Sequence, residues 1–69
     1  MIQANKLKGI IVSKGYSQRK LAIMMGMSPK TFYDKMKKGV FDSDEIMEMM
    51  NILDIDNPKE IFFAHDGTQ

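Results

Sequence analysis

The sequence predicts an all-α domain of four to five short helices, and three observations indicate this class. Apolar residues recur at intervals of three and four along most of the chain, which is the spacing of one helix face. The alternation of apolar and polar residues that marks a half-buried strand is missing. Glycine, proline and capping residues divide the chain into segments of helical length. We therefore expect one domain over residues 1–69, with a frayed tail at about 65–69.

Two helices are expected in the first part of the chain. The first spans about 4–14 and ends at Gly15, because glycine suits the left-handed position that follows a helix. The second begins after Ser17, whose side chain can cap a helix, and ends before Gly26. The inward-facing residues predicted from helical spacing are Leu7, Ile10 and Ile11, with Lys14 on the same face, and then Leu21, Ala22 and Met25.

Three more helices are expected in the remainder of the chain. The third follows the N-cap residue Ser28 and runs to about 37 or 38, before a glycine. The fourth spans 43–53 and follows a capping box that begins at Asp42. A second capping box precedes a short fifth helix over 58–64. The inward-facing residues predicted for the fourth helix are Ile46, Met49 or Met50, and Leu53.

Charge is divided unevenly between the two halves of the chain. Residues 1–38 hold nine lysine and arginine residues and one acidic residue, a net charge of +8. Residues 39–69 hold one lysine and eight acidic residues, a net charge of −7. Such an asymmetry gives the folded molecule a strong dipole, so the basic half is a candidate surface for a polyanion and the acidic half is expected to face away from it.

Several classes of site and location have little support in the sequence. The absence of cysteine excludes disulfides and thiolate metal sites, and the single histidine, His65, has no companion ligands near it. The longest apolar runs are three or four residues, and the N-terminal segment lacks the pattern of a signal peptide. We therefore expect a cytoplasmic protein with no membrane association, no cofactor, no metal site and no small-molecule ligand.

The stretch 18–37 has the spacing that a helix-turn-helix requires. Only about three residues separate the second and third expected helices, which suits two helices that cross steeply. Ala22 provides a small side chain where the helices cross, and Gly26 can adopt the positive φ of the turn. The apolar residues expected to fill the space between the helices are Leu21, Met25, Met27 and Phe32.

The segments YSQRKLAIMMGMSPKTFYDKMKKG and FDSDEIMEMMNILDI resemble the second to fourth helices of Cro/repressor-type helix-turn-helix domains. The ending EIFFA resembles that of small prophage-encoded members, so the resemblance covers roughly 7–64. The family commonly has an apolar residue three positions after the one at Phe32, whereas this chain has Lys35 followed by Met36. Either Met36 packs in its place or the third helix is slightly rotated. Whether Tyr33 or Asp34 is the main base contact therefore stays open.

The resemblance implies a lambda-repressor-like fold that binds double-stranded DNA. Gln18 matches the phosphate-clamping first residue of the second helix, and Thr31 matches a hydroxyl position that often contacts phosphate. The groove-facing positions match Ser28, Pro29, Lys30, Tyr33, Asp34 and Lys37. Lys30 can donate to guanine O6 and N7, and Asp34 can accept from cytosine N4. The lysines expected to contact phosphates are Lys14, Lys37 and Lys38.

Two groups of apolar residues have alternative interpretations. The eight methionines are better explained as core filling than as a binding groove, with Met24 and Met47 as exposed exceptions. Adjacent residues on a helix point about 100° apart, so Phe62 and Phe63 cannot both face inward fully. One of them can instead pair with a second subunit, and we favour this dimer interface over complete burial.

The function expected from these observations is sequence-specific DNA binding by a transcriptional regulator of a phage or mobile element, Cro-like or repressor-like. A homodimer is expected to read a two-fold operator through the major groove, with half-sites about 34 Å apart. The alternative is a protein-interaction module on the same fold, such as an antitoxin or adaptor that uses the acidic fourth helix and the phenylalanine pair. An enzyme is disfavoured, because the sequence lacks a cysteine nucleophile, a placed histidine and a phosphate-binding loop.

Overall fold

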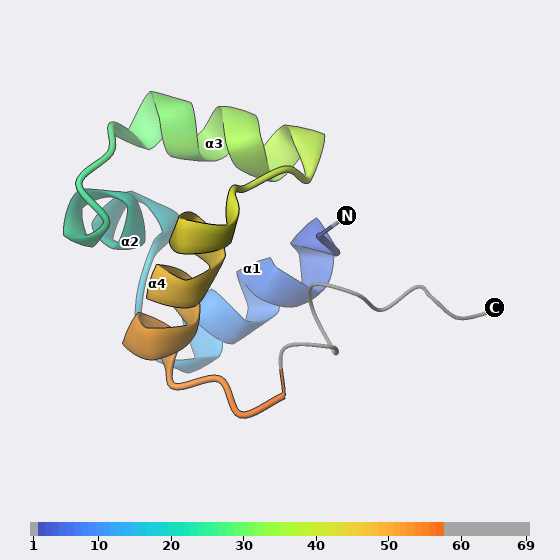
Figure 1. Cartoon of the computed structure of the whole chain (residues 1–69). Coiled ribbons are helices and arrows are strands. Elements are labelled where there is room, and N and C mark those ends of the chain that lie inside the picture. The colour runs from blue at the N-terminus through green and yellow to red at the C-terminus, as the bar shows by residue number, and fades with distance from the viewer. Residues whose placement is uncertain (1, 58–69) are drawn as a thin grey trace, which may run out of the picture.

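The computed structural model describes residues 2–57, which form four helices and no strand (Figure 1). This confirms the all-α class. The expected fifth helix over 58–64, with Phe62 and Phe63, lies outside the described residues, as does the tail at 65–69. The four helices are α1 (Ala4–Ser13), α2 (Gln18–Met24), α3 (Pro29–Lys38) and α4 (Ser43–Leu53).

Each helix after α1 begins at a cap that the sequence predicts. The Ser17 hydroxyl accepts a hydrogen bond from the Lys20 N–H at 3.0 Å, at the start of α2. At α4 the Asp42 carboxylate accepts from the Glu45 N–H, and the Glu45 carboxylate accepts from the Asp42 N–H, both at 2.9 Å. This reciprocal pair is the capping box, which satisfies two N–H groups that the helix cannot satisfy itself. The glycines with positive φ, each beyond the end of a helix, are Gly15, Gly26 and Gly39.

The core lies where the four helices meet, and most of its members come from the predicted inward faces. Phe32 is completely buried, and its ring lies against that of Phe41, with centroids 5.5 Å apart and planes tilted by 56°. Phe41 and Ile2 are core residues that the helical pattern did not predict, since both lie outside helices. The buried apolar residues are Ile2, Leu7, Ile11, Leu21, Ala22, Phe32, Met36, Phe41, Met49 and Leu53.

The methionines divide as the sequence predicts. Met36 and Met49 are buried, and the half-buried ones, which pack against the core, are Met25, Met27 and Met50. Met24 and Met47 are exposed, with 44% and 63% of their surfaces accessible. Met therefore fills the gaps of an irregular helical core, which suits its flexible side chain.

Two contacts set the position of α1 relative to the other helices. The Ile2 N–H donates to the Gly39 carbonyl at 3.1 Å, so the start of α1 lies beside the end of α3. Lys14, the residue after α1, donates through Nζ to the Asp54 carbonyl at 3.5 Å, at the other end of the helix. α3 lies across one edge of the molecule, above α4 and α1 in the view of Figure 1. None of the helices between residues 2 and 57 combines the length and the hydropathy that a membrane crossing requires.

Candidate nucleic-acid interface

The turn between α2 and α3 has the features expected of a helix-turn-helix. Ala22 is completely buried, and its carbonyl accepts a hydrogen bond from the Met27 N–H at 3.0 Å, so the chain folds tightly back over the end of α2. Gly26 has a φ of 76°, and no atom lies within 4 Å of where its Cβ would be. Glycine is therefore needed here for its backbone conformation and not for close packing.

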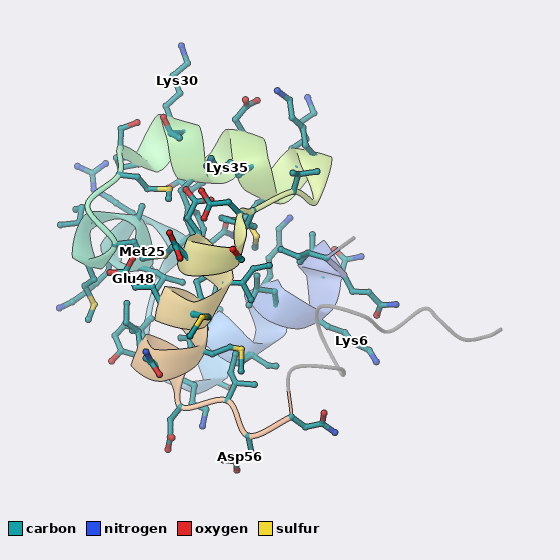
Figure 2. All side chains as sticks on the ribbon, viewed as in Figure 1. Lys6, Met25, Lys30, Lys35, Glu48 and Asp56 are labelled. Atoms are coloured by element: carbon teal, nitrogen blue, oxygen red, sulfur yellow. The ribbon has the colours of Figure 1, made fainter. Side chains whose placement is uncertain are left out.

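α3 is held to the core by one narrow side. Phe32 and Met36 are its only buried residues. Because successive helix residues are rotated by about 100°, the side opposite these two carries Lys30, Asp34 and Lys37. All three are exposed, and Figure 2 shows Lys30 extending away from the body of the molecule. Asp34 therefore lies near the centre of the outward side. Tyr33, 47% exposed, lies on the flank.

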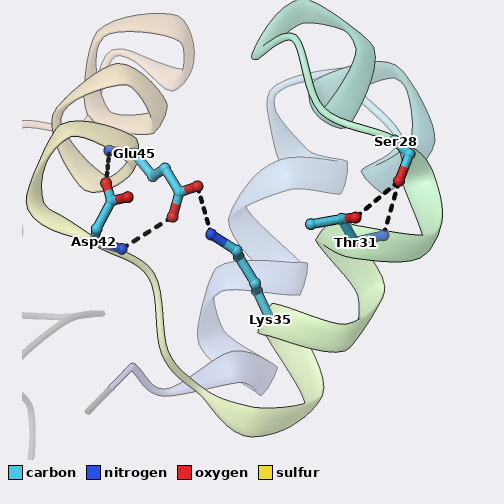
Figure 3. Close-up of polar contacts among 5 residues, drawn as sticks. All are labelled: Ser28, Thr31, Lys35, Asp42 and Glu45. Atoms are coloured by element: carbon cyan, nitrogen blue, oxygen red, sulfur yellow. Dashed lines mark hydrogen bonds and ion pairs between the residues drawn. The ribbon is translucent and has the colours of Figure 1, made fainter.

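The sequence left open whether Met36 packs into the core in place of an apolar residue at position 35. Met36 is 1% exposed, so it occupies that core position. Lys35 turns to the side and forms an ion pair with Glu45 of α4, with Nζ and Oε2 2.6 Å apart (Figure 3). The Lys35 charge is therefore committed to holding α3 against α4, which leaves it out of the outward face of α3.

A second ion pair lies on the outward side of α3 itself. Lys38 Nζ is 3.2 Å from the Asp34 carboxylate, one helical turn away, and both side chains are more than half exposed. Such a pair is weak in water, so an approaching anion can compete with Asp34 for Lys38. Lys30 and Lys37 form no ion pair with any residue between 2 and 57, so their charges are available to a ligand.

The hydroxyl groups of Ser28 and Thr31, at the start of α3, are hydrogen-bonded to each other. The Ser28 hydroxyl accepts from the Thr31 N–H at 3.1 Å and donates to the Thr31 hydroxyl oxygen at 2.9 Å (Figure 3). Pro29 takes the first helical position, where it has no N–H to offer. The Ser28 hydroxyl is therefore used as a helix cap, whereas the Thr31 hydroxyl still has a proton that it can donate to a ligand.

Gln18 lies in a hollow formed by three helices. The hollow is open to solvent and lies between the start of α2 and the Tyr33 flank of α3. The residues that line it are Lys8, Ser17, Gln18, Arg19, Tyr33, Met36 and Lys37. It thus brings together Gln18, Tyr33 and Lys37, which the sequence predicted as site residues. Lys8 and Arg19 were not predicted. The only sequence signal for Lys8 was its place on the polar side of the first helix.

Lys14 does not join the lysines of α3. Its Nζ lies at the Asp54 carbonyl, at the end of α4, in a hollow that it shares with Asp56. The other end of α1 is the one that lies beside α3, through the bond between Ile2 and Gly39. Lys14 is also exposed, so the inward placement predicted from helical spacing is wrong for this residue.

Two acidic residues at the start of α4, Asp42 and Glu45, lie closer to α3 than the uneven charge of the sequence suggested. Asp42 lines a shallow hollow together with the side chains of α3, and Glu45 pairs with Lys35. The end of α4 with Asp54 and Asp56 does lie away from α3, and Figure 2 shows Asp56 at the opposite side of the molecule. The first turn of α4 therefore lies beside α3, whereas the end of α4 lies away from it.

Comparison with known sequences places the chain in a family. No curated protein and no solved structure matches it. The profile of one protein family matches residues 2–65, which is nearly the entire chain. The chain therefore belongs to the family described as protein of unknown function DUF739.

Proposed function

We propose that this chain is a sequence-specific double-stranded DNA-binding protein of the Cro/repressor helix-turn-helix type, and that it regulates transcription as a homodimer. The observation that carries the proposal is that α3 buries only Phe32 and Met36, with Lys30, Asp34 and Lys37 exposed on the opposite side. A helix exposed in this way at the edge of a molecule can enter the major groove, which is about 12 Å wide.

The side chains of α3 divide by what they can contact in that groove. Lys30 lies in the first turn, points away from the body of the molecule (Figure 2), and can donate to guanine O6 and N7. Asp34 can accept from cytosine N4 and repels phosphate elsewhere, which would add specificity. Thr31 and Tyr33 stand on either flank, where a hydroxyl can reach a phosphate or a base edge.

The hollow between α1, α2 and α3 supplies the contacts to the DNA backbone. The side chains of Lys8, Arg19 and Lys37 surround it with positive charge, and Gln18 adds an amide donor. Phosphate contacts of this kind fix the orientation of the protein on the duplex without reading its sequence. In a dimer with half-sites about 34 Å apart, each copy would place one α3 in the major groove.

A duplex selected from random sequence provides the ligand with which to test the proposal. Lys30→Ala should weaken binding to that duplex by about 1–3 kcal/mol and relax the base preference at one position. Lys37→Ala should weaken binding to all duplexes and lower the slope of log affinity against log salt by about 1. Fluorescence anisotropy titrations at several salt concentrations measure both effects.

Two lysines elsewhere on the molecule provide matched controls. Lys6 on α1 points away from α3 (Figure 2), and Lys14 lies at Asp54. Lys6→Ala and Lys14→Ala remove the same charge, so they should change affinity far less than Lys37→Ala. Equal losses for all four variants would indicate attraction by net charge alone, without an interface on α3. DNA binding should collapse when both Lys30 and Lys37 are replaced, whereas under the protein-interaction alternative the binding of a protein partner should survive the same double replacement.

A further inference from the structure

α2 carries an exposed apolar spot that neither the core nor the proposed DNA interface uses. Ile23 is 60% exposed and lies on the side of α2 opposite the buried Leu21, and Met24, next to it, is 44% exposed. The cations Arg19 and Lys20 flank them one turn earlier, and these four residues line a shallow hollow with Ser17. We refer to Arg19, Lys20, Ile23 and Met24 as the basic–apolar face.

α4 carries a spot of the opposite charge. Met47 is 63% exposed, on the side of α4 away from the buried Met49 and Leu53. Asp44 lies three residues before Met47 and Glu48 directly follows it, and both are exposed. We refer to Asp44, Met47 and Glu48 as the acidic–apolar face.

We propose that the basic–apolar face of one copy docks on the acidic–apolar face of a second copy. Each face has exposed apolar side chains beside two like charges, and the two faces have opposite signs. Within one copy Ile23 and Met47 are both largely exposed, so the two faces do not cover each other. The chain thus carries both halves of a complementary pair, which identifies a second copy as the partner that fits each half.

This contact joins two different surfaces. It either closes as a two-fold pair in which each copy uses both faces, or leaves one face of each kind free so that assembly continues into a ring or an open chain. The faces are small, which places the contact among weak interfaces that form only at high protein concentration. High salt weakens the contact further, because it screens the charges around the apolar spots. Arg19 also lines the hollow proposed for the DNA backbone, but the variants that test this contact leave Arg19 and every residue of α3 unchanged, so the test does not depend on DNA binding.

Sedimentation velocity on the full chain, from dilute to concentrated solution, tests the proposal. The wild-type weight-average mass should rise with concentration, and the rise should shrink in high salt. Ile23→Gln combined with Met24→Gln removes the apolar part of one face, and Met47→Gln removes that of the other. Each variant should lose the rise, although glutamine keeps a good helix former at these exposed positions. Circular dichroism melts should show both variants folded as wild type.

Mixing the two variants decides whether the contact joins different faces. The α2 variant keeps an intact acidic–apolar face, and the α4 variant keeps an intact basic–apolar face, so an equimolar mixture should regain association that neither has alone. Val12→Gln removes a side chain that is 71% exposed on α1, outside both faces, and should leave the rise unchanged. A wild-type mass that is independent of concentration, a mixture that does not associate, or a loss with only one of the two variants overturns the proposal.

Discussion

α3 and α4 are almost equal in length, ten and eleven residues, but the core uses them differently. α3 buries Phe32 and Met36 on one narrow side. α4 buries Met49 and Leu53, and four of its other residues are half-buried: Glu45, Ile46, Met50 and Ile52. α4 is therefore a broadly packed support, whereas most of the circumference of α3 is left to solvent. The comparison teaches that attachment by a narrow stripe is what makes α3 available to a ligand.

The charges of these two helices have a local explanation that does not require any ligand. The last turn of α3 holds three lysines, and the first turn of α4 holds Asp44 and Glu45. Cations stabilise the end of a helix and anions its beginning, because each opposes the helix dipole. The uneven charge of the chain therefore partly serves helix stability. The argument for DNA binding consequently depends on where Lys30 and Lys37 point, not on the net charge of +8 in residues 1–38.

The largest effect on stability is expected when α3 loses one of its two buried side chains. Phe32→Ala leaves a cavity beside Phe41 and should lower the free energy of unfolding by roughly 3–5 kcal/mol. A domain of this size has little stability in reserve, so we expect the variant to be largely unfolded at room temperature. Thermal unfolding followed by circular dichroism measures the loss. A cooperative transition near that of wild type would mean that α3 does not depend on this contact.

Removal of the N-terminal caps should have a smaller effect that is similar for both helices. Ser28→Ala and Asp42→Ala should each lower the free energy of unfolding by about 1 kcal/mol, because each leaves helix N–H groups without their partner. Only Ser28→Ala lies at the start of α3, so only this variant should also change DNA affinity. Urea unfolding and anisotropy titrations on the same samples separate the two effects. Equal loss of affinity in both variants would show that α4 contributes to the interface as well.

The order of the helices and their ends could be predicted from sequence, because caps, glycines and periodicity act within a few residues. Ser17, Ser28 and Asp42 cap the helices where these local signals place them. Most of the buried core residues could also be predicted from helical periodicity. Phe41 was missed because its burial depends on Phe32, a contact that no helical repeat encodes.

The direction of a side chain could be predicted where helical phase alone determines it, but not where distant segments meet. Lys30 and Lys37 are on the outward side of α3 as their spacing requires. The pairing of Lys35 with Glu45 joins residues ten apart across a turn, and Lys8 reaches the α3 hollow from another helix. Neither contact has a local sequence signal. Lys14 was predicted to contact phosphate, but its Nζ lies at the Asp54 carbonyl, which is another contact between distant segments.

Asp34→Asn should have the smallest effect on stability. It is also the most direct test of whether the outward side of α3 faces DNA. The pair with Lys38 is exposed on both sides, so its loss should change the free energy of unfolding by less than about 0.5 kcal/mol. Removal of a carboxylate from the centre of the surface proposed to face DNA should nevertheless strengthen binding to non-specific duplexes, because that charge repels phosphate. Asp56→Asn makes the same chemical change on the far side of the molecule and should have little effect on affinity (Figure 2). If the two variants gain affinity equally, the carboxylates act through net charge, and α3 has no special relation to the DNA.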